Sequence, residues 1–352
     1  MAQMAVKSAG RKKQAELVCQ EMLPEVSRTF ALSIRFLPGN LGRAVLCAYL
    51  LCRIADTIED DPVAPPDQKI ALLDRLMDCF DNPALANGMP SASAWVKGEE
   101  AHVRLVSHTD LVFILFWTLP TRTQETVRHW VGEMVLGMQK FVGFYPHGIR
   151  IQTIEEYKKY CYYVAGTVGH LLTDLWYEHS GYVDRAEYKV LLERCEAFGQ
   201  ALQTVNILKD VAWDAEHENS IYVPEQALRE HGSSQQFLLN PERLTQNRAA
   251  LGSLMDLAHS DLDDALEYLL CVPKFAVSIR LFCILPLLFA YATLRELDKT
   301  ATMLQPGGSV KISRLEVKSL IMAGCGVVMS NHGIRWLVAR TRRGPFTLGG
   351  KR

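Results

Sequence analysis

The sequence predicts an all-α protein. Apolar residues recur at every third and fourth position along most of the chain, which is the period of a helix with one buried face. The apolar/polar alternation that marks a half-buried strand is not sustained over the 352 residues. Proline and glycine are dispersed, so they separate helices rather than domains. Together these observations predict roughly ten to twelve helices in a single helical bundle, with one domain spanning residues 1–352.

The composition limits the class of protein. Hydrophobic residues make up 49% of the chain and charged residues 22%, which suits a soluble protein with a large core. The formal net charge is −1, so no global charge favours nucleic acid as a partner. The nine cysteines form no CxxC pair and are typical of buried side chains in a reducing compartment. Lys7, Arg11, Lys12 and Lys13 are not followed by the apolar segment of a signal peptide, so we expect a cytoplasmic protein.

The first candidate anion site is the stretch SRTF, which precedes an apolar helix. Ser27 is of a residue type that caps helix N-termini. The backbone N–H groups at such an end suit an anion, and Arg28 would add a charged guanidinium. The alternative is an ordinary cap beside a surface arginine.

A cluster of carboxylates follows in the stretch RIADTIEDD. Asp56, Glu59 and Asp60 are three and four residues apart, so they share one face of a helix. Arg53 lies one turn earlier on that face, and Asp61 follows directly. Carboxylate oxygens are ligands for Mg²⁺, which takes one or two of them and completes its octahedron with water and substrate phosphate. The alternative is a solvated helix face.

The stretch YCYYVAGTVGH predicts a helix that contains two glycines. Gly166 and Gly169 each lower helix stability by about 1 kcal/mol relative to alanine. Their presence indicates either close helix packing or the close approach of a ligand. Tyr160 and Tyr163 would be the polar groups in the second case.

The stretch QTVNILKDVAWD carries the strongest chemical signal. Gln203, Asn206, Asp210 and Asp214 stand at i, i+3, i+7 and i+11, which places them on one helical face. Carboxylates among apolar neighbours lose hydration, and a bound cation is the simplest way to offset that cost. We expect this face to oppose the Asp56 face across a cavity and to hold divalent cations there.

The most apolar segment is Phe275–Leu294, which contains Arg280 and is broken by Pro286. Its longest uncharged run is short for a bilayer span, so a wall of the core or of an apolar cavity is expected. A last apolar helix near 320–329 is followed by a basic tail with Trp336. The tail predicts either a solvated terminus or peripheral contact with an anionic membrane. Its cations are Arg335, Arg340, Arg342, Arg343, Lys351 and Arg352.

Three motifs resemble the squalene/phytoene synthase family and, within it, the squalene synthases. They are VSRTFALSIRFLPGNLGRAVLCAYLLCRIADTIEDD, YKKYCYYVAGTVGH and LQTVNILKDVAWD, in a match that covers about 25–298. The resemblance implies an isoprenoid synthase fold around a central apolar cavity, with a flap, last helix and basic tail over 305–352. It implies a Mg²⁺-dependent, head-to-head condensation of two farnesyl diphosphates by way of presqualene diphosphate, with reduction by NADPH to squalene. A monomer is expected.

The resemblance also implies roles for individual residues. The metal-binding motifs would be Asp56, Glu59 and Asp60, and then Asp210 and Asp214. The substrate diphosphates would be bound by Ser27, Arg28, Arg53, Gln203 and Asn206. Tyr160 matches a tyrosine that assists proton removal or stabilises the cation. The apolar stretches 103–117 and 275–294 would form walls of the cavity.

Departures from the family pattern leave the product open. Trp213 stands where the second motif usually has an acidic residue, so Asp214 and Glu216 would hold more of the metal. The flap reads VKISR with one basic residue displaced, and Lys311 and Arg314 are the candidates for the cofactor phosphates. No GxGxxG motif is present, so a nicotinamide site would not be of the Rossmann type. Synthesis of dehydrosqualene, phytoene or presqualene diphosphate without reduction is an alternative, and a non-catalytic assembly protein on the same fold is a remote one.

Overall fold

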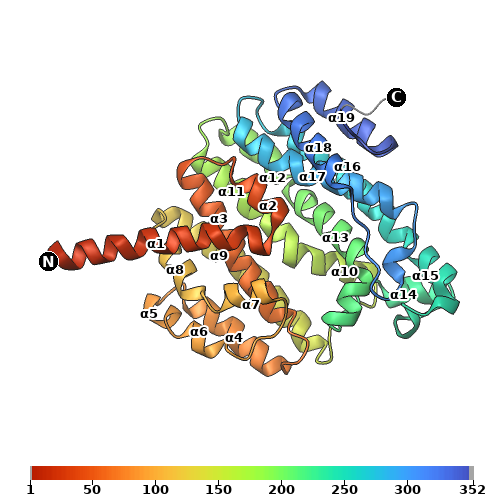
Figure 1. The fold of residues 1–352 in the computed structure, drawn as a ribbon, viewed down its shortest axis with the longest axis horizontal. Coiled ribbons are helices and arrows are strands. Elements are labelled where there is room, and N and C mark those ends of the chain that lie inside the picture. The colour runs from red at the N-terminus through yellow and green to blue at the C-terminus, as the bar shows by residue number, and fades with distance from the viewer. Residues whose placement is uncertain (1, 349–352) are drawn as a thin grey trace. The chain divides into compact units, whose positions relative to one another are not determined.

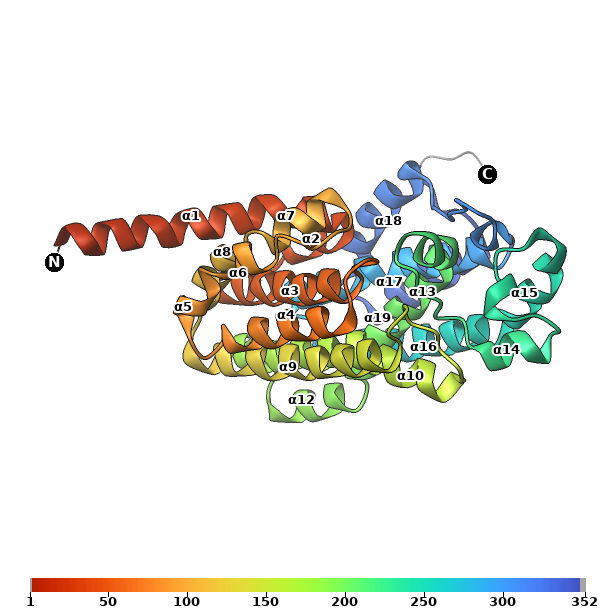
Figure 2. The ribbon, with the colours of Figure 1, turned by 90° about the horizontal axis from the view of Figure 1, so that it is seen from below.

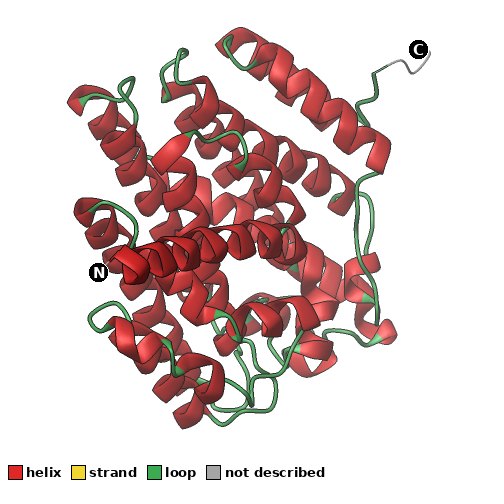
Figure 3. Ribbon diagram, turned by 60° about the vertical axis from the view of Figure 1, so that its left-hand side comes forward, coloured by secondary structure: helices red, strands yellow, loops and turns green. Residues whose placement is uncertain are grey.

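The structure is a computed structural model that describes residues 2–348, and it is helical almost throughout (Figure 1). Those residues form nineteen α-helices, and their only extended pairing is an isolated bridge between Arg150 and Ile221. Figure 3 shows the loops as connections between helices. The all-α prediction is confirmed. The predicted number of helices is too low, because several connections themselves form helices of one or two turns.

The chain forms two compact units. The first comprises Met1–Pro146 and Asp174–His179, and the second comprises His147–Thr173 and Ser180–Arg352. One helix, α11 (Thr167–His179), contributes residues to both. That the whole chain acts as one catalytic domain, with its core at about 25–298, stays a prediction.

The first unit is built around α3. Leu50, Leu51, Ile54 and Ile58 of this helix are fully buried, and α3, α4 and α9 pack side by side (Figure 2). Its described helices are α1 (Ala2–Val26), α2 (Arg28–Ile34), α3 (Gly39–Glu59), α4 (Pro66–Asp78), α5 (Pro83–Ala86), α6 (Met89–Ala92), α7 (Glu100–Val106), α8 (Thr109–Phe116) and α9 (Thr121–Phe144).

The apolar stretch 103–117, if taken as one helix, is interrupted in the structure. The segment forms α7 and α8, which are separated by Ser107 and His108. Ser107 Oγ donates to the Arg104 carbonyl oxygen at 2.7 Å, and His108 Nδ1 lies 2.7 Å from the same oxygen. Side chains that bond the local backbone in this way compete with helix continuation.

The second unit is built on α13, α16 and α17, which pack on one another. Its helices are α10 (Ile154–Cys161), a π-helical turn (Tyr162–Gly166), the first part of α11, α12 (Arg185–Leu192), α13 (Cys195–His217), α14 (Glu225–Glu230), α15 (Leu244–Ala250), α16 (Gly252–Cys271), α17 (Val277–Leu297), α18 (Arg314–Val327) and α19 (Asn331–Arg343). Short 3₁₀ turns lie at Gln235–Phe237, Pro241–Arg243 and Thr302–Leu304.

Helix α17 forms a wall of the core of this unit. It is long and apolar enough to cross a membrane by length and composition, but 78% of its most apolar window is buried inside the protein. That burial agrees with the predicted core wall. The break predicted at Pro286 is wrong, because α17 continues through this residue. Proline removes one helical hydrogen bond, and the full burial of Leu285 and Leu287 beside it favours the helix by packing.

Candidate active site

The first acidic helix, α3, carries Asp56 beside Arg53. The Arg53 guanidinium donates a short hydrogen bond to Asp56 Oδ2 one turn away, and both side chains are about one third exposed. Burial lowers the pKa of Arg53, but Asp56 and Tyr49 more than compensate, so that its pKa is raised above the ordinary value. This end of α3 therefore presents a carboxylate next to a permanently charged guanidinium.

The other carboxylates at this end of α3 differ in exposure. Asp56 and Asp60 are half-buried, whereas Glu59 is 3% exposed, so the predicted three-residue face is not uniformly open. Asp60 lies at the C-cap of α3. Asp61 is buried and accepts hydrogen bonds from the backbone N–H groups of Val63, Ala64 and Lys97 at 2.6–2.8 Å. These bonds give Asp61 a role in holding the following loop.

Ser27 is the N-cap of α2, as predicted. Its Oγ accepts a hydrogen bond from the backbone N–H of Phe30 at 3.2 Å, and Arg28 is exposed. The capping half of the prediction is confirmed, and the binding of an anion by Ser27 and Arg28 stays a prediction.

The sequence reasoning missed His102 of α7, which belongs to the same unit. Burial first, and then the nearby cation of Arg53, lower the pKa of His102 below its ordinary value. Asp56 and Glu99 oppose this shift, and His102 Nε2 lies 3.7 Å from Glu99 Oε2. His102 stands alone among aliphatic and acidic residues in the sequence, so no spacing signal could have linked it to Arg53.

The second acidic helix, α13, contains all four residues of the predicted polar face. Gln203, Asp210 and Asp214 are half-buried and Asn206 is exposed, while the helix buries a separate set of side chains. That buried set includes Thr204, Val205, Ile207, Leu208, Val211 and Ala212. The helical offsets that predicted one face are therefore confirmed.

Lys209 was also missed by the sequence reasoning. Its Nζ lies 3.0 Å from Asp210 Oδ2, and both side chains are about one third exposed. A cation thus accompanies Asp210 on α13 as Arg53 accompanies Asp56 on α3. The only signal in the sequence was that Lys209 is the chain neighbour of Asp210.

The predicted flap begins beside the C-terminal end of α13. The backbone N–H of Gly307 donates to Glu216 Oε2 at 3.0 Å. Gly307 has a φ of +67°, in the region that favours glycine. Lys311 and Arg314 are both exposed, and Arg314 is the first residue of α18. One oxygen of Glu216 therefore contacts the flap, and the part that Glu216 plays beside Asp214 in metal binding stays a prediction.

Tyr160 lies at the end of α10 and is 3% exposed. Its hydroxyl donates to the hydroxyl of Tyr222 at 3.2 Å, and the two rings stack with centroids 4.9 Å apart. Tyr222 comes from the segment after α13, so it could not be linked to Tyr160 from the sequence. The catalytic role of Tyr160 stays a prediction.

Gly169, which follows Tyr160, and Gly199 of α13 serve helix packing. A Cβ added at Gly169 would lie 1.9 Å from the carbonyl oxygen of Cys195, at the start of α13. A Cβ at Gly199 of α13 would lie 2.0 Å from the carbonyl oxygen of Ala165. The backbones of these helices therefore touch at glycine, which favours the packing explanation for Gly169 over ligand approach. At Gly166 the neighbours are side chains, with Tyr162 Cδ2 at 3.1 Å.

The donor set suits magnesium in its chemistry. Asp56, Asp60, Asp210 and Asp214 are carboxylates that remain partly exposed, and Mg²⁺ binds such oxygens one or two at a time. Among the described residues, no three His, Cys, Asp or Glu side chains gather in a ready-made metal cluster. The opposition of the α3 and α13 faces and the central apolar cavity stay predictions.

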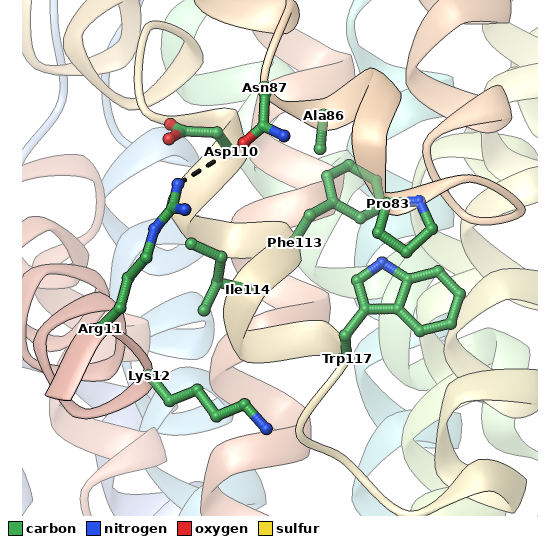
Figure 4. Close-up of a pocket in the computed structure, with 9 residues that line it drawn as sticks. All are labelled: Arg11, Lys12, Pro83, Ala86, Asn87, Asp110, Phe113, Ile114 and Trp117. Carbon is green, nitrogen blue, oxygen red and sulfur yellow. Dashed lines mark hydrogen bonds between the residues drawn. The ribbon is translucent and has the colours of Figure 1, made fainter. Parts of the chain in front are cut away.

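Two cavities lie outside these faces. One, of about 150 Å³, lies in the second unit. Its lining residues are Tyr157, Lys158, Cys161, Gln200, Thr204, Leu257 and Asp261. The other, of about 520 Å³, lies in the first unit between α1, α5 and α8 (Figure 4). There Arg11 donates to Asn87 Oδ1 at 3.5 Å, above the apolar side chains of Phe113, Ile114 and Trp117. Neither cavity contains a predicted site residue.

Comparison with known proteins places these features in a family. The squalene/phytoene synthase family model matches residues 23–316. The squalene synthase of Schizosaccharomyces pombe is 27% identical over 311 residues, which cover 86% of this chain and 64% of that protein. The chain thus spans slightly less than two thirds of the length of this relative.

Solved structures share the fold. TcSQS in complex with the ligand BPH1237 has a TM-score of 0.76 and 22% identity, with 94% of this chain and 98% of that chain covered. A dehydrosqualene synthase in complex with a ligand has a TM-score of 0.59 and 19% identity, with 96% and 98% covered. The isoprenoid synthase fold predicted from the motifs is confirmed. By its motifs, its two acidic helices and the extent of the family match, this chain belongs to the squalene/phytoene synthase family.

Proposed function

We propose that this chain is a squalene synthase. It would condense two farnesyl diphosphates head to head through presqualene diphosphate and reduce the product with NADPH to squalene, in a Mg²⁺-dependent reaction. The observation that carries the proposal is the polar face of α13, where Asp210 and Asp214 stay partly exposed one turn apart on a helix that buries its other sides. The S. pombe relative is a squalene synthase, which favours this product over others.

The proposed chemistry needs stabilisation of a leaving diphosphate. Arg53 and Lys209 accompany the two acidic faces, and the planar guanidinium of Arg53 can meet phosphate oxygens through two hydrogen bonds. Ser27, Arg28, Gln203 and Asn206 complete the proposed diphosphate contacts. Mg²⁺, held by Asp56, Glu59, Asp60, Asp210 and Asp214, would supply additional positive charge for the departing diphosphate.

Departure of diphosphate leaves an allylic cation. The stacked, buried pair of Tyr160 and Tyr222 offers aromatic faces that attract a cation. The Tyr160 hydroxyl, which is hydrogen-bonded to that of Tyr222, would assist proton removal. An apolar cavity would keep water away from the cation. NADPH would be bound through its phosphates by Lys311 and Arg314, which are exposed cations on the flap.

Products that need no reductant are the alternatives within the family. They are dehydrosqualene, phytoene from C20 substrates, and presqualene diphosphate. The flap favours reduction, because it is held to Glu216 two residues beyond Asp214 and carries two cations. We expect a cytoplasmic monomer that contacts the membrane peripherally.

The deciding experiment supplies the purified chain with farnesyl diphosphate and Mg²⁺, with and without NADPH, and identifies the products by mass spectrometry. Squalene formed only with NADPH supports the proposal. An identical hydrocarbon in both reactions supports dehydrosqualene synthesis, and presqualene diphosphate as the end product in both supports a synthase that stops halfway. Preference for geranylgeranyl diphosphate in a parallel reaction supports phytoene synthesis. No Mg²⁺-dependent consumption of either substrate would indicate a non-catalytic protein.

A further inference from the structure

Helix α18 is blue in Figure 1. It presents a line of large apolar side chains to solvent. Leu315, Met322 and Met329 are 60%, 67% and 50% exposed. They are seven residues apart, so they follow one line along the helix and its last turn. Leu348, which is 53% exposed, lies next to this line, because its backbone N–H donates to Ser319 Oγ at 3.0 Å. We call these four residues the α18 stripe.

The other side of α18 is buried against α17. Leu320 and Gly324 are buried, and a Cβ added at Gly324 would lie 3.3 Å from Leu285 and 3.4 Å from Leu288 of α17. The stripe therefore lies on the side of the helix that faces away from the core of its unit. Nothing in the packing of α18 on α17 requires large apolar residues there.

The exposed charges of α18 and of the segment just before it are all positive. Lys311, Arg314 and Lys318 are exposed. Glu316 is the only acidic residue between 305 and 330 in the sequence, and it is buried in an ion pair with Arg295 at 2.8 Å. An exposed apolar line whose own helix adds exposed cations and no exposed carboxylate complements the surface of an anionic bilayer, with acyl chains below and negative headgroups above.

Two of the arginines of α19 are engaged in ion pairs. Arg335 pairs with Glu267 at 2.8 Å, and Arg342 pairs with Asp263 at 3.0 Å. The membrane contact that the sequence suggested for the tail thus has a better surface on α18. Lys351 and Arg352 of that tail lie outside the described residues.

We propose that the α18 stripe is the surface through which this protein docks on an anionic lipid bilayer, with Leu315, Met322, Met329 and Leu348 in the acyl-chain boundary and Lys318 at the headgroups. This inference rests on the proposed function in one respect, since farnesyl chains and squalene partition into lipid. A second copy of the chain fits the stripe less well, because a two-fold contact would bring the same cations of both copies together.

The test measures sedimentation of the full chain with vesicles of phosphatidylcholine alone and of phosphatidylcholine with about one quarter phosphatidylglycerol. We expect binding to the anionic vesicles only, weakened by salt because the headgroup contacts are screened. The double variant L315Q/M322Q should lower the partition coefficient at least about tenfold, and K318Q should lower it less and reduce its salt dependence. The matched control V190Q/F237Q removes two exposed apolar residues elsewhere in the same unit and should bind like the original chain.

Two results would overturn the proposal. One is the absence of binding to anionic vesicles, or equal binding by L315Q/M322Q and the original chain. The other is a dimer, detected by light scattering, that L315Q/M322Q dissociates, since it would assign the stripe to a second copy. Product formation from farnesyl diphosphate in vesicle-free buffer is measured separately, so a failure of docking and a failure of the proposed reaction are distinguishable.

Discussion

A substitution at Asp210 distinguishes a catalytic contribution of this carboxylate from a structural one. Its ion pair with Lys209 is about one third exposed, and such pairs contribute between about 0 and 1 kcal/mol to folding. Asp210→Asn should therefore shift the thermal midpoint by no more than a few degrees. If the carboxylate helps to hold Mg²⁺ and diphosphate, the same change should lower turnover by about 100-fold or more. Glu193→Gln, which removes a mostly exposed carboxylate just before α13, is the control and should leave turnover unchanged. A normal rate in Asp210→Asn would contradict the assigned role.

Asp261 should make stability depend on pH. Burial raises the pKa of Asp261 from 3.8 to about 6, with Lys158 opposing the shift. Between about pH 4 and 6 the unfolded chain releases this proton while the folded chain retains it, so stability falls as pH rises through this window. After allowance for its partial exposure, the loss above pH 6 is about 1 kcal/mol. Asp261→Asn should therefore melt about 2–4 °C higher than the original chain at pH 7.5 and at the same temperature near pH 4. Asp256→Asn, at an exposed position of the same helix, should show no such crossover.

At the scale of elements, the sequence predicted what depends on local spacing. The α13 face was predictable because Gln203, Asn206, Asp210 and Asp214 follow the helical period, and the Ser27 cap was predictable from residue type. The burial of Glu59 and the passage of α17 through Pro286 were not, because each depends on which neighbouring elements pack there. The pairing of Tyr160 with Tyr222 joins segments 62 residues apart, and no local pattern encodes such a contact.

Close backbone contact between helices gives the prediction for this scale. Gly169→Ala would place a methyl group 1.9 Å from the Cys195 carbonyl oxygen, where backbone rather than a flexible side chain must move. We expect a loss of about 2–4 kcal/mol in unfolding free energy. Gly143→Ala, in the helix α9 with no atom near the added methyl, should instead gain up to about 1 kcal/mol from helix propensity. Urea denaturation followed by circular dichroism would measure the unfolding free energy of both variants. A Gly169→Ala chain as stable as the Gly143→Ala chain would refute the packing account.

At the scale of the whole molecule, the proposed catalytic residues are divided between the two units. Asp56 and Arg53 belong to the first unit and Asp210 and Lys209 to the second, so each unit contributes one carboxylate helix with its own cation. Family membership followed from the order and spacing of three motifs along the chain, which a single motif would not have supported. The distance between the two faces depends on tertiary structure, which no motif specifies. The proposed function therefore requires both units to be folded.

The integrity of the second unit depends on one buried cation. Arg280 is fully buried, and its guanidinium donates to the carbonyl oxygens of Val328 and Val272, each at 2.6 Å, and to Asn331 Oδ1 at 2.7 Å. These acceptors lie at the ends of α16 and α18 and at the start of α19, so a single side chain joins three helix ends to α17. Burial lowers the pKa of Arg280, and none of the three acceptors is charged, so the cation is held by hydrogen bonds rather than by an ion pair.

Removal of this side chain should destabilise the unit as a whole. Arg280→Met fills similar space but removes the donor from two buried carbonyl oxygens and from the half-buried Asn331 Oδ1, for which we expect a loss of about 3–5 kcal/mol. Arg280→Lys restores the charge but not the planar arrangement of donors, so it should recover only part of the loss. Arg335→Gln breaks the exposed ion pair with Glu267 and should change stability by less than about 1 kcal/mol. Midpoints of urea unfolding for the three variants rank these effects. An Arg280→Met chain as stable as Arg335→Gln would mean that the guanidinium does not hold the helix ends together.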